Sequence, residues 1–226
     1  MKKGFTLSEV LITLGIIGVI AALTIPAVVA NYRNKIYVAQ LKKVYGQILE
    51  ATQTIMSDEQ SDDFYTTSAG IPQDTSADNC KTGACYFLRN YFKTINENCG
   101  TGTHKCVGES YKSLNGTVLT AKPGGTYCVQ TNNGATICAA HNSNNQVTSL
   151  TVDVNGKDEP NTAGRDVFSM DIKKDGSLSD YESGSNIPGI EGADADKCGN
   201  GSTSGINSAA AGCLTKIIEA GWKMEY

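Results

Sequence analysis

The sequence is poor in the side chains on which most enzymes and nucleic-acid-binding proteins depend. Its 226 residues include two histidines, one tryptophan and five prolines, and the net charge is −4. A chain with an acidic balance and no large basic patch lacks the surface that nucleic-acid binding requires. It also contains no phosphate-binding loop, nucleophile elbow or zinc signature. We therefore expect no enzymatic activity, no catalytic residue and no direct contact with nucleic acid.

Charged residues are missing altogether from Val10 to Ala30. This apolar run is long enough to span a bilayer, and Lys2 and Lys3 before it favour a cytoplasmic N-terminus. A secretory signal peptide would have a shorter apolar region and a good small-residue cleavage site, and Ala21-Ala22 is a poor one. A plain membrane anchor fits the length but leaves Glu9 unexplained, because a carboxylate in an apolar span costs roughly a few kcal/mol unless it finds a partner.

The residues from Lys2 to Ile12 read KKGFTLSEVLI. This string, together with the apolar run after it, resembles the cleavage and assembly signal of type IV pilins and type II secretion pseudopilins. The resemblance implies that a prepilin peptidase cuts between Gly4 and Phe5 and that the new amine of Phe5 is methylated. It also implies that Glu9 pairs with that amine on a neighbouring subunit. Such pairing satisfies both charges in a low-dielectric helix bundle and sets the axial register.

The same resemblance implies a function, a location and a set of partners. The chain would be a structural subunit of a type IV pilus-like filament or of a type II secretion pseudopilus. Its partners would be identical or homologous pilin subunits, the prepilin peptidase and methyltransferase, and an inner-membrane assembly platform with its ATPase. It would first sit in the inner membrane with its head outside the cytoplasm, and then in a filament of the cell envelope or surface. The alternatives are a minor or tip pilin acting in adhesion or DNA uptake, and an anchored protein that does not polymerise.

Helical patterning continues beyond the apolar run. Apolar residues recur there with alternating spacings of four and three: Tyr37, Leu41, Val44, Ile48, Ala51 and Ile55. This stripe is typical of an amphipathic helix, so we expect one continuous helix from Phe5 to about Met56. Pro26 removes a backbone hydrogen bond and predicts a kink. In the resembled family this part of the helix can bend or melt during filament assembly.

The chain is thus predicted to have four parts: a leader (1–4), a membrane-spanning and filament-core helix (5–30), an amphipathic continuation (31–56) and an extracytoplasmic head (57–226). In the head we expect short helices at Ala84–Asn96 and Leu214–Ala220. The expected strands are Thr117–Ala121, Thr126–Thr131, Ala135–Ala140, Val147–Val154 and Val167–Ile172. A long helix packed on an antiparallel sheet is an α+β fold.

All the cysteines lie in the polar part of the chain: Cys80, Cys85, Cys99, Cys106, Cys128, Cys138, Cys198 and Cys213. An even number on one side of a membrane segment favours disulfides in an oxidising compartment. A zinc site is the rival interpretation, but the cysteine spacings are wider than those of zinc knuckles and the chain has few histidines.

The expected hairpin indicates one of the disulfides directly, and the other pairs follow only from their positions along the chain. If Asn132-Asn133-Gly134 is a three-residue hairpin loop, Cys128 lies opposite Cys138, within disulfide reach. Cys198 with Cys213 would close a glycine-rich loop. Cys80–Cys85 and Cys99–Cys106 are nearest-neighbour assignments, because eight cysteines permit many pairings.

One acidic stretch could hold calcium. It resembles a segment common in the C-terminal sheets of pseudopilin-like proteins, some of which hold calcium in a nearby loop. Oxygen ligands of the kind that calcium prefers are present at Asp153, Asn155, Asp158 and Asp166. The simpler interpretation, which we favour, is a set of turns, because Asn-Gly is a turn dipeptide and Asp caps turns. We expect no other cofactor.

Overall fold

The computed structural model describes residues 4–72, 80–97, 99, 106–125, 127–141, 147–181, 195–199 and 205–226. Residue contacts divide the chain into two compact units, Met1–Ile36 and Tyr37–Tyr226. The helix α1 (Leu7–Asp58) begins in the first unit and ends in the second. The expected helix is therefore present, and it starts and ends two residues later than the sequence pattern indicated.

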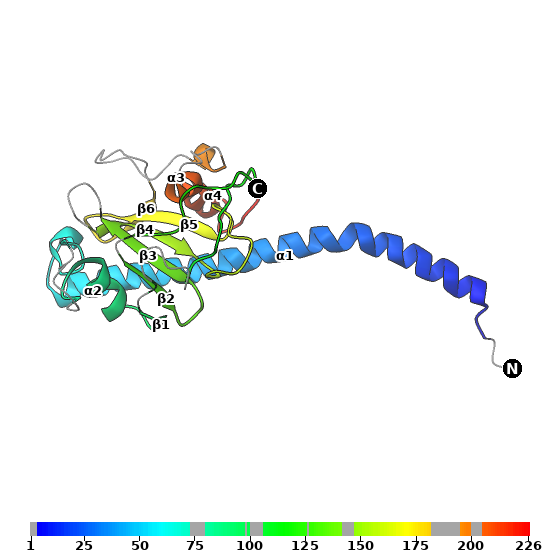
Figure 1. Ribbon diagram of the computed structural model, residues 1–226, viewed down its shortest axis with the longest axis horizontal. Coiled ribbons are helices and arrows are strands. Elements are labelled where there is room, and N and C mark those ends of the chain that lie inside the picture. The colour runs from blue at the N-terminus through cyan, green and yellow to red at the C-terminus, as the bar shows by residue number, and fades with distance from the viewer. Residues whose placement is uncertain are drawn as a thin grey trace. The chain divides into compact units, whose positions relative to one another are not determined.

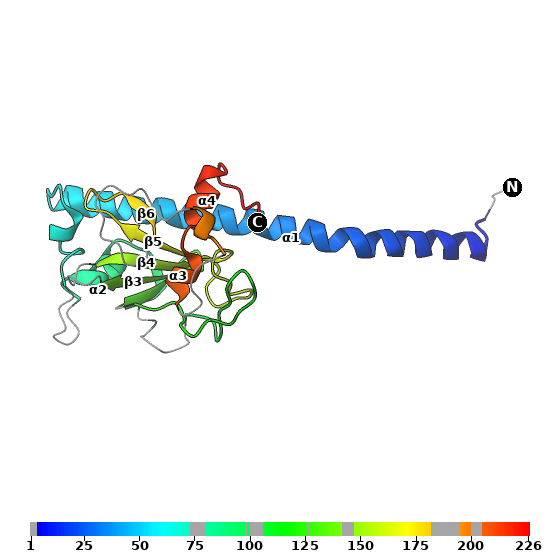
Figure 2. The ribbon, with the colours of Figure 1, turned by 90° about the horizontal axis from the view of Figure 1, so that it is seen from above.

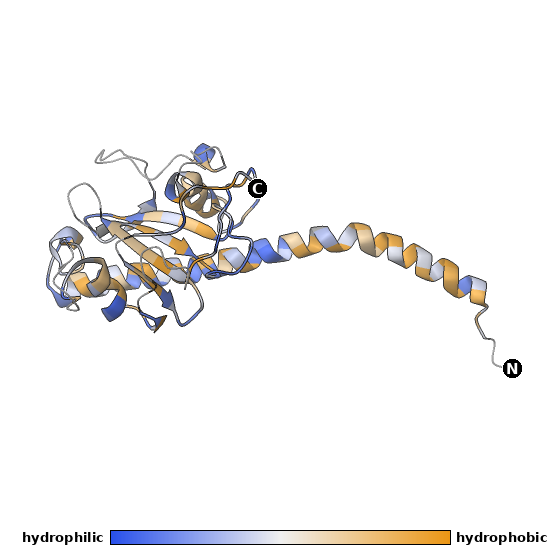
Figure 3. Ribbon diagram, viewed as in Figure 1, coloured by the Kyte–Doolittle hydropathy of each residue, from blue (hydrophilic) through white to orange (hydrophobic). Residues whose placement is uncertain are grey.

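Within the first unit, α1 has no charged side chain from Val10 to Ala30, and this stretch is apolar on all sides. The large hydrophobic side chains of α1 from Leu7 to Ile36 are exposed, and Figure 3 shows hydrophobic colour along most of this part. By length and composition the helix can cross a membrane. A helix that is apolar all round requires an apolar environment, either lipid or other helices.

In the second unit, the predicted stripe of α1 is buried. At most 8% of each of its six side chains is exposed, and Leu41, Val44, Ile48 and Ile55 are fully buried. They share a hydrophobic core with residues that alternate along the central strands: Val129, Ile137, Ala139, Leu150, Val152, Phe168 and Met170. The second part of α1 therefore packs on one face of a sheet (Figures 1 and 2).

Within the described residues, the sheet has six strands in the order β1-β2-β3-β4-β5-β6, and each strand is antiparallel to its neighbour in the sequence. The strands are β1 (Thr94–Asn96), β2 (Tyr127–Thr131), β3 (Thr136–His141), β4 (Val147–Asp153), β5 (Val167–Ile172) and β6 (Leu178–Asp180). This antiparallel meander, with α1 on one face, confirms the predicted α+β class.

Short helices complete the second unit. They are η1 (Phe64–Thr66), α2 (Gly83–Asn90), η2 (Ala195–Lys197), α3 (Ile206–Ala210) and α4 (Cys213–Glu219). On α3, Asn207 accepts hydrogen bonds from Thr151 of β4 (2.6 Å) and Ser169 of β5 (2.9 Å). These two strand residues alternate with the core residues that face α1, so α3 lies on the opposite face of the sheet.

Two predicted elements are wrong. The helix expected over Ala84–Asn96 ends at Asn90, and Thr94–Asn96 instead forms the edge strand β1. Pairing with β2 overrides the helical spacing there, because Asn132 N donates to Lys93 O at 2.9 Å and Thr94 lies opposite Thr131. The strand expected over Thr117–Ala121 is reduced to a single bridge, between Lys112 and Val118. Val118 is 60% exposed, so its β propensity is not supported by burial.

The β2–β3 hairpin has the register that the sequence predicts. Thr131 N donates to Ala135 O at 2.8 Å across the three-residue loop, and Gly134 has φ +91°, a value that favours glycine. Cys128 lies opposite Cys138, and a disulfide joins them. The other disulfides are Cys80–Cys85, Cys99–Cys106 and Cys198–Cys213. The structure thus contains all four of the pairings considered above.

Candidate functional site

The bond at which cleavage is predicted lies in a short non-helical segment before α1. Gly4, Phe5 and Thr6 all precede the first helical residue, Leu7, and the side chain of Phe5 is 88% exposed. A protease needs access to an extended backbone, and a Cβ added at Gly4 would meet nothing within 4 Å. The predicted Gly4–Phe5 cleavage site is therefore accessible. The rest of the predicted leader, Met1 to Lys3, lies outside the described residues.

Thr6 and Glu9 form a reciprocal cap at the start of α1. Thr6 donates to Glu9 Oε2 through its backbone N–H (2.8 Å) and through its hydroxyl (2.7 Å), and Glu9 N donates back to Thr6 Oγ1 (3.3 Å). This is a capping box, in which the threonine and the glutamate satisfy N–H groups that the first turn leaves unpaired. Glu9 is thus held beside the predicted new N-terminus at Phe5, and its side chain remains exposed.

Pro26 lies within α1, which is helical on both sides of it. Figure 1 shows this part of the helix as a gently curved ribbon without a break. Proline lacks the N–H that would bond to the preceding turn, so the helix is locally weaker there than a run of aliphatic residues would be. Its bending or melting during assembly stays a prediction.

The comparisons with known proteins place a recognised signal over this segment. Residues 1–25 match the family model of the prokaryotic N-terminal methylation motif. No curated protein and no solved structure matches the chain. The chain therefore carries a type IV pilin-like prepilin signal, as the resemblance of its N-terminal string indicated.

A second candidate site lies in the head, where the β4–β5 connection begins and ends with a buried aspartate. Asp153 is the last residue of β4 and Asp166 directly precedes β5, and neither side chain is exposed to solvent. Tyr111 donates to Asp153 Oδ2 at 2.8 Å. The two oxygens of Asp166 accept the backbone N–H groups of Asn161 (2.8 Å) and Thr162 (2.6 Å). The aspartates thus fix the turn that returns the chain to the sheet.

Burial controls the protonation of this pair. Desolvation and the nearby carboxylate of Asp166 raise the pKa of Asp153 well above its usual value, while the hydroxyl of Tyr111 opposes the rise. Burial likewise raises the pKa of Asp166 to about 6, and the N–H groups of Thr162 and Asn161 oppose it. Two like charges in a dry site disfavour each other, so either one carboxyl group holds a proton or a nearby cation balances the two charges.

Of the four oxygen ligands predicted from the sequence, the structure brings three together. Asn155 donates to the backbone carbonyl groups of Asp158 (2.8 Å) and Glu159 (3.2 Å), and its side chain also lowers the pKa of Asp166. Asp158, however, is exposed and contributes only its main chain to this network. The sequence pattern did not indicate Tyr111, which lies far away along the chain, or Asn161 as members of this network.

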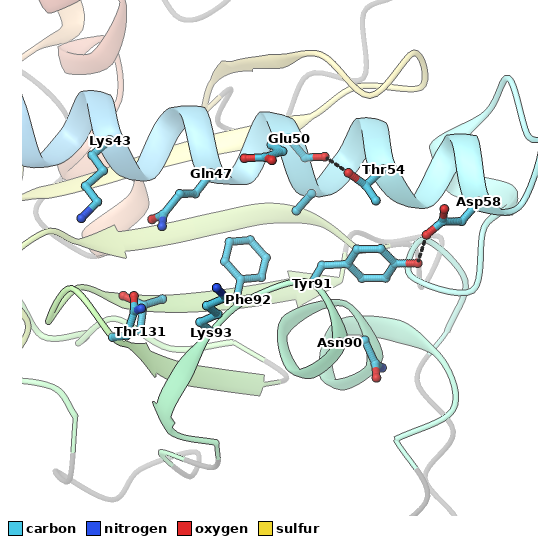
Figure 4. Close-up of a pocket in the computed structure, with 12 residues that line it drawn as sticks. Lys43, Gln47, Glu50, Thr54, Asp58, Asn90, Tyr91, Phe92, Lys93 and Thr131 are labelled. Carbon is cyan, nitrogen blue, oxygen red and sulfur yellow. Dashed lines mark hydrogen bonds between the residues drawn. The ribbon is translucent and has the colours of Figure 1, made fainter.

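A groove of about 640 Å³ lies between the second part of α1 and the segment after α2 (Figure 4). Lys43, Gln47, Glu50 and Asp58 line it from α1, and Lys93 lines it from the other side. Both signs of charge are present, and the lining residues include no histidine, cysteine or serine. The groove therefore offers no nucleophile paired with a histidine base, and we assign it no chemistry.

Proposed function

We propose that this chain is a structural subunit of a type IV pilus-like filament or of a type II secretion pseudopilus. The observation that carries the proposal is the prepilin signal over residues 1–25, which continues into a helix that is exposed and apolar on all sides. A helix of this kind is suited first to a bilayer and then to a bundle of identical helices, because both surroundings are apolar. The processing signal points to a structural protein rather than an enzyme.

The proposed function divides the chain into four parts, which act first in the membrane and then in the filament. Residues 1–4 are removed as a leader, 5–30 span the membrane and later form the filament core, and 31–56 continue the helix. Residues 57–226 form the extracytoplasmic head. Lys2 and Lys3 support insertion with the N-terminus in the cytoplasm, where the prepilin peptidase and methyltransferase act. The assembly platform and its ATPase then supply the work of extraction.

Glu9 has the central role in the proposed assembly step. Cleavage after Gly4 leaves an ammonium group at Phe5, and methylation keeps its charge. In an apolar bundle that ammonium group and the Glu9 carboxylate both need a partner of opposite charge. Pairing between neighbouring subunits meets both needs and fixes the axial position of each new subunit. The capping box supports this role, because it gives Glu9 hydrogen-bond partners before assembly.

Intact mass and N-terminal sequencing of the exported protein test the proposal. We expect loss of Met1–Gly4 and one added methyl group on Phe5. A Gly4→Val variant should stay uncut, because a branched side chain blocks close approach of the peptidase, and a Glu9→Gln variant should be cut normally. An unprocessed N-terminus in the unaltered protein, or a cut near Ala22, would show that the chain is not a pilin-like precursor.

A further inference from the structure

Charged side chains are segregated by sign along α1 beyond its apolar run. Between positions 31 and 49 they are all basic, and between positions 50 and 63 they are all acidic: Arg33, Lys35, Lys42 and Lys43, then Glu50, Asp58, Glu59, Asp62 and Asp63. Helices gain stability from opposite charges three or four residues apart and from basic residues in the last turn. This arrangement provides neither, and the last turn of α1 has no basic residue. The segregation therefore does not serve the stability of the single chain.

The charges at the two ends of this segment are exposed. Four of them lie in the second unit: Lys42, Lys43, Asp58 and Glu59. The ion pairs found among the described residues involve none of these four. Lys42 instead places its ammonium group 5.4 Å from the ring centre of Trp222, which positions the charge without cancelling it. Each end is thus a charge that another molecule can balance.

The two ends have matching spacings. Asp58 lies sixteen positions after Lys42, and Glu59 lies sixteen positions after Lys43. In an α-helix sixteen residues span roughly 24 Å. A second copy that is parallel to the first and shifted by this length would bring its lysines level with the two acidic residues. A copy at the same level would place like charges side by side, and like charges repel.

Lys42 and Asp58 also lie on opposite sides of α1. Sixteen residues turn a helix by roughly 160° beyond four full turns. Two parallel copies related by a shift present opposite sides to each other, so a contact between them needs its two partners about half a turn apart. Lys42 and Asp58 meet this condition.

The shape of the two sides supports the same contact. Asp58 lines the groove of about 640 Å³ beside α1, together with Glu50 (Figure 4). On the Lys42 side, Gly46 lies one turn further along the helix, is exposed, and has open space where a Cβ would be. A glycine there lets a neighbouring backbone approach closely. The Lys42 side of one copy can therefore approach the groove side of another.

We propose that copies of this chain contact each other through α1, with Lys42 of one copy paired with Asp58 of a parallel copy shifted by roughly 24 Å. The inference rests on the proposed function, because that function places parallel copies side by side. It adds a polar contact beyond the apolar core, which selects one stagger of neighbouring heads. Each pair is between exposed charges, so it is individually weak and is screened by salt.

Zero-length cross-linking of filaments tests the contact. A carbodiimide joins an amine to a carboxylate that touches it, and mass spectrometry identifies the linked peptides. We expect a link between Lys42 and Asp58. It must join two copies, because the two residues lie roughly 24 Å apart along one helix. Its yield should fall at high salt, since screening weakens the attraction between exposed charges.

Charge reversal separates this contact from folding. Asp58→Lys puts a basic residue in the last turn of α1, which favours the helix, so the variant should melt no lower than the unaltered protein. We expect it to form roughly fivefold fewer filaments, because an attraction becomes a repulsion. Adding Lys42→Glu restores the pair with its signs exchanged and should restore the filaments. Glu109→Lys makes the same charge change in an exposed loop beside α3, on the other face of the sheet, and should assemble normally.

The inference is overturned if the link between Lys42 and Asp58 is absent from filaments, or if Asp58→Lys forms filaments normally. It is also overturned if Lys42→Glu fails to rescue Asp58→Lys, because these charges then meet another partner, such as anionic lipid head groups. In all three cases, loss of Met1–Gly4 and filaments from the unaltered protein leave the proposed function intact. An unaltered protein that is neither cut nor assembled would overturn the proposed function and this contact with it.

Discussion

Cys128 on β2 and Cys138 on β3 lie directly opposite each other, with their Cα atoms 4.0 Å apart. Their disulfide is buried beside the one between Cys99 and Cys106, and the four residues form a cluster of their own. Because side chains alternate between the faces of a sheet, a one-residue slip of β2 against β3 would separate the two cysteines. The disulfide therefore fixes the register of the hairpin.

Removing this disulfide should cost more stability than removing the smallest one. We expect the paired change Cys128→Ala with Cys138→Ala to lower the free energy of unfolding by about 2–4 kcal/mol, from lost chain restraint and lost packing. Cys80→Ala with Cys85→Ala removes a disulfide between residues five positions apart instead of ten, and Cys80 is only partly buried, so this pair of changes should cost less stability. Urea unfolding of both variants measures the difference, and a reversed order would contradict the prediction.

Gly46 offers a stabilising substitution. It lies inside α1, it is exposed, and an added Cβ would meet nothing within 4 Å. Glycine in a helix interior costs stability relative to alanine, so Gly46→Ala should raise the free energy of unfolding by about 0.5–1 kcal/mol. Gly125→Ala is the contrasting variant, because its Cβ would collide with the carbonyl oxygen of Ala139 and should destabilise the head. Equal effects of the two changes in urea unfolding would refute this explanation.

The free energy of unfolding should depend on pH through the raised pKa of the buried Asp180 carboxyl group. This side chain is buried on β6 and accepts the N–H groups of Gly212 (3.0 Å) and Thr215 (2.8 Å) at the start of α4. Burial raises the pKa of Asp180 to about 6 despite these bonds. Burial also raises the pKa of Tyr226, and the negative charge of the nearby Asp180 adds to that rise. The pKa of an aspartate in the unfolded chain is about 3.9. The folded state therefore binds this proton more tightly, and ionisation above pH 6 costs up to about 3 kcal/mol.

We expect the free energy of unfolding of the unaltered protein, relative to Asp180→Asn, to increase as the pH falls from 7 to 4, because asparagine does not titrate. Asp175→Asn is a control of opposite sign. The hydroxyl and the N–H of Ser177 lower the pKa of Asp175, so its small contribution is lost as the pH falls. Denaturant unfolding at several pH values measures both differences. A flat difference for Asp180→Asn would show that its burial does not disfavour the charge.

Glu9 can be tested for charge and for capping separately. Glu9→Val should still insert and be cleaved, but filament assembly should fall sharply, because valine cannot pair with the Phe5 amine. Glu9→Gln keeps an oxygen that can accept from Thr6 and loses only the charge, so it should fail in the same way. Thr24→Val, which alters a hydroxyl bonded to Ile20 O in the same apolar run, should assemble normally. Normal filaments from Glu9→Gln would show that the cap matters and the charge does not.

The sequence predicts this fold best where one local pattern determines the structure. The stripe from Tyr37 to Ile55 is buried as its spacing indicates, and the β2–β3 register follows from the loop chemistry at Asn133 and Gly134. The edge strand β1 could not be predicted in this way. Its three residues continue a helical spacing, and only the partner strand, more than thirty residues away, decides their conformation.

The candidate sites differ in the same way: a local sequence pattern defines one of them, and residues distant in the sequence form the other. The prepilin signal is a contiguous string, so Gly4, Phe5 and Glu9 can be identified from it without knowledge of the fold. The network in the head is not contiguous, because Tyr111 reaches Asp153 across forty-two positions of sequence. Burial determines which side chains of the β4–β5 connection join this network. Asn161 is buried and Asp158 is exposed to solvent, although both are ordinary turn residues in the sequence.

The strand order β1 to β6 has a consequence for how the head folds. Each strand pairs with its neighbour along the chain, so most of the ladder can form through short loop closures, which have low entropic cost. A meander of this kind has a low contact order for a β protein, and low contact order accompanies fast folding. The β1–β2 connection, which contains the Cys99–Cys106 disulfide, is the longest segment that the ladder must close. We therefore expect β2 to β5 to form first, and β1 to join the sheet after them.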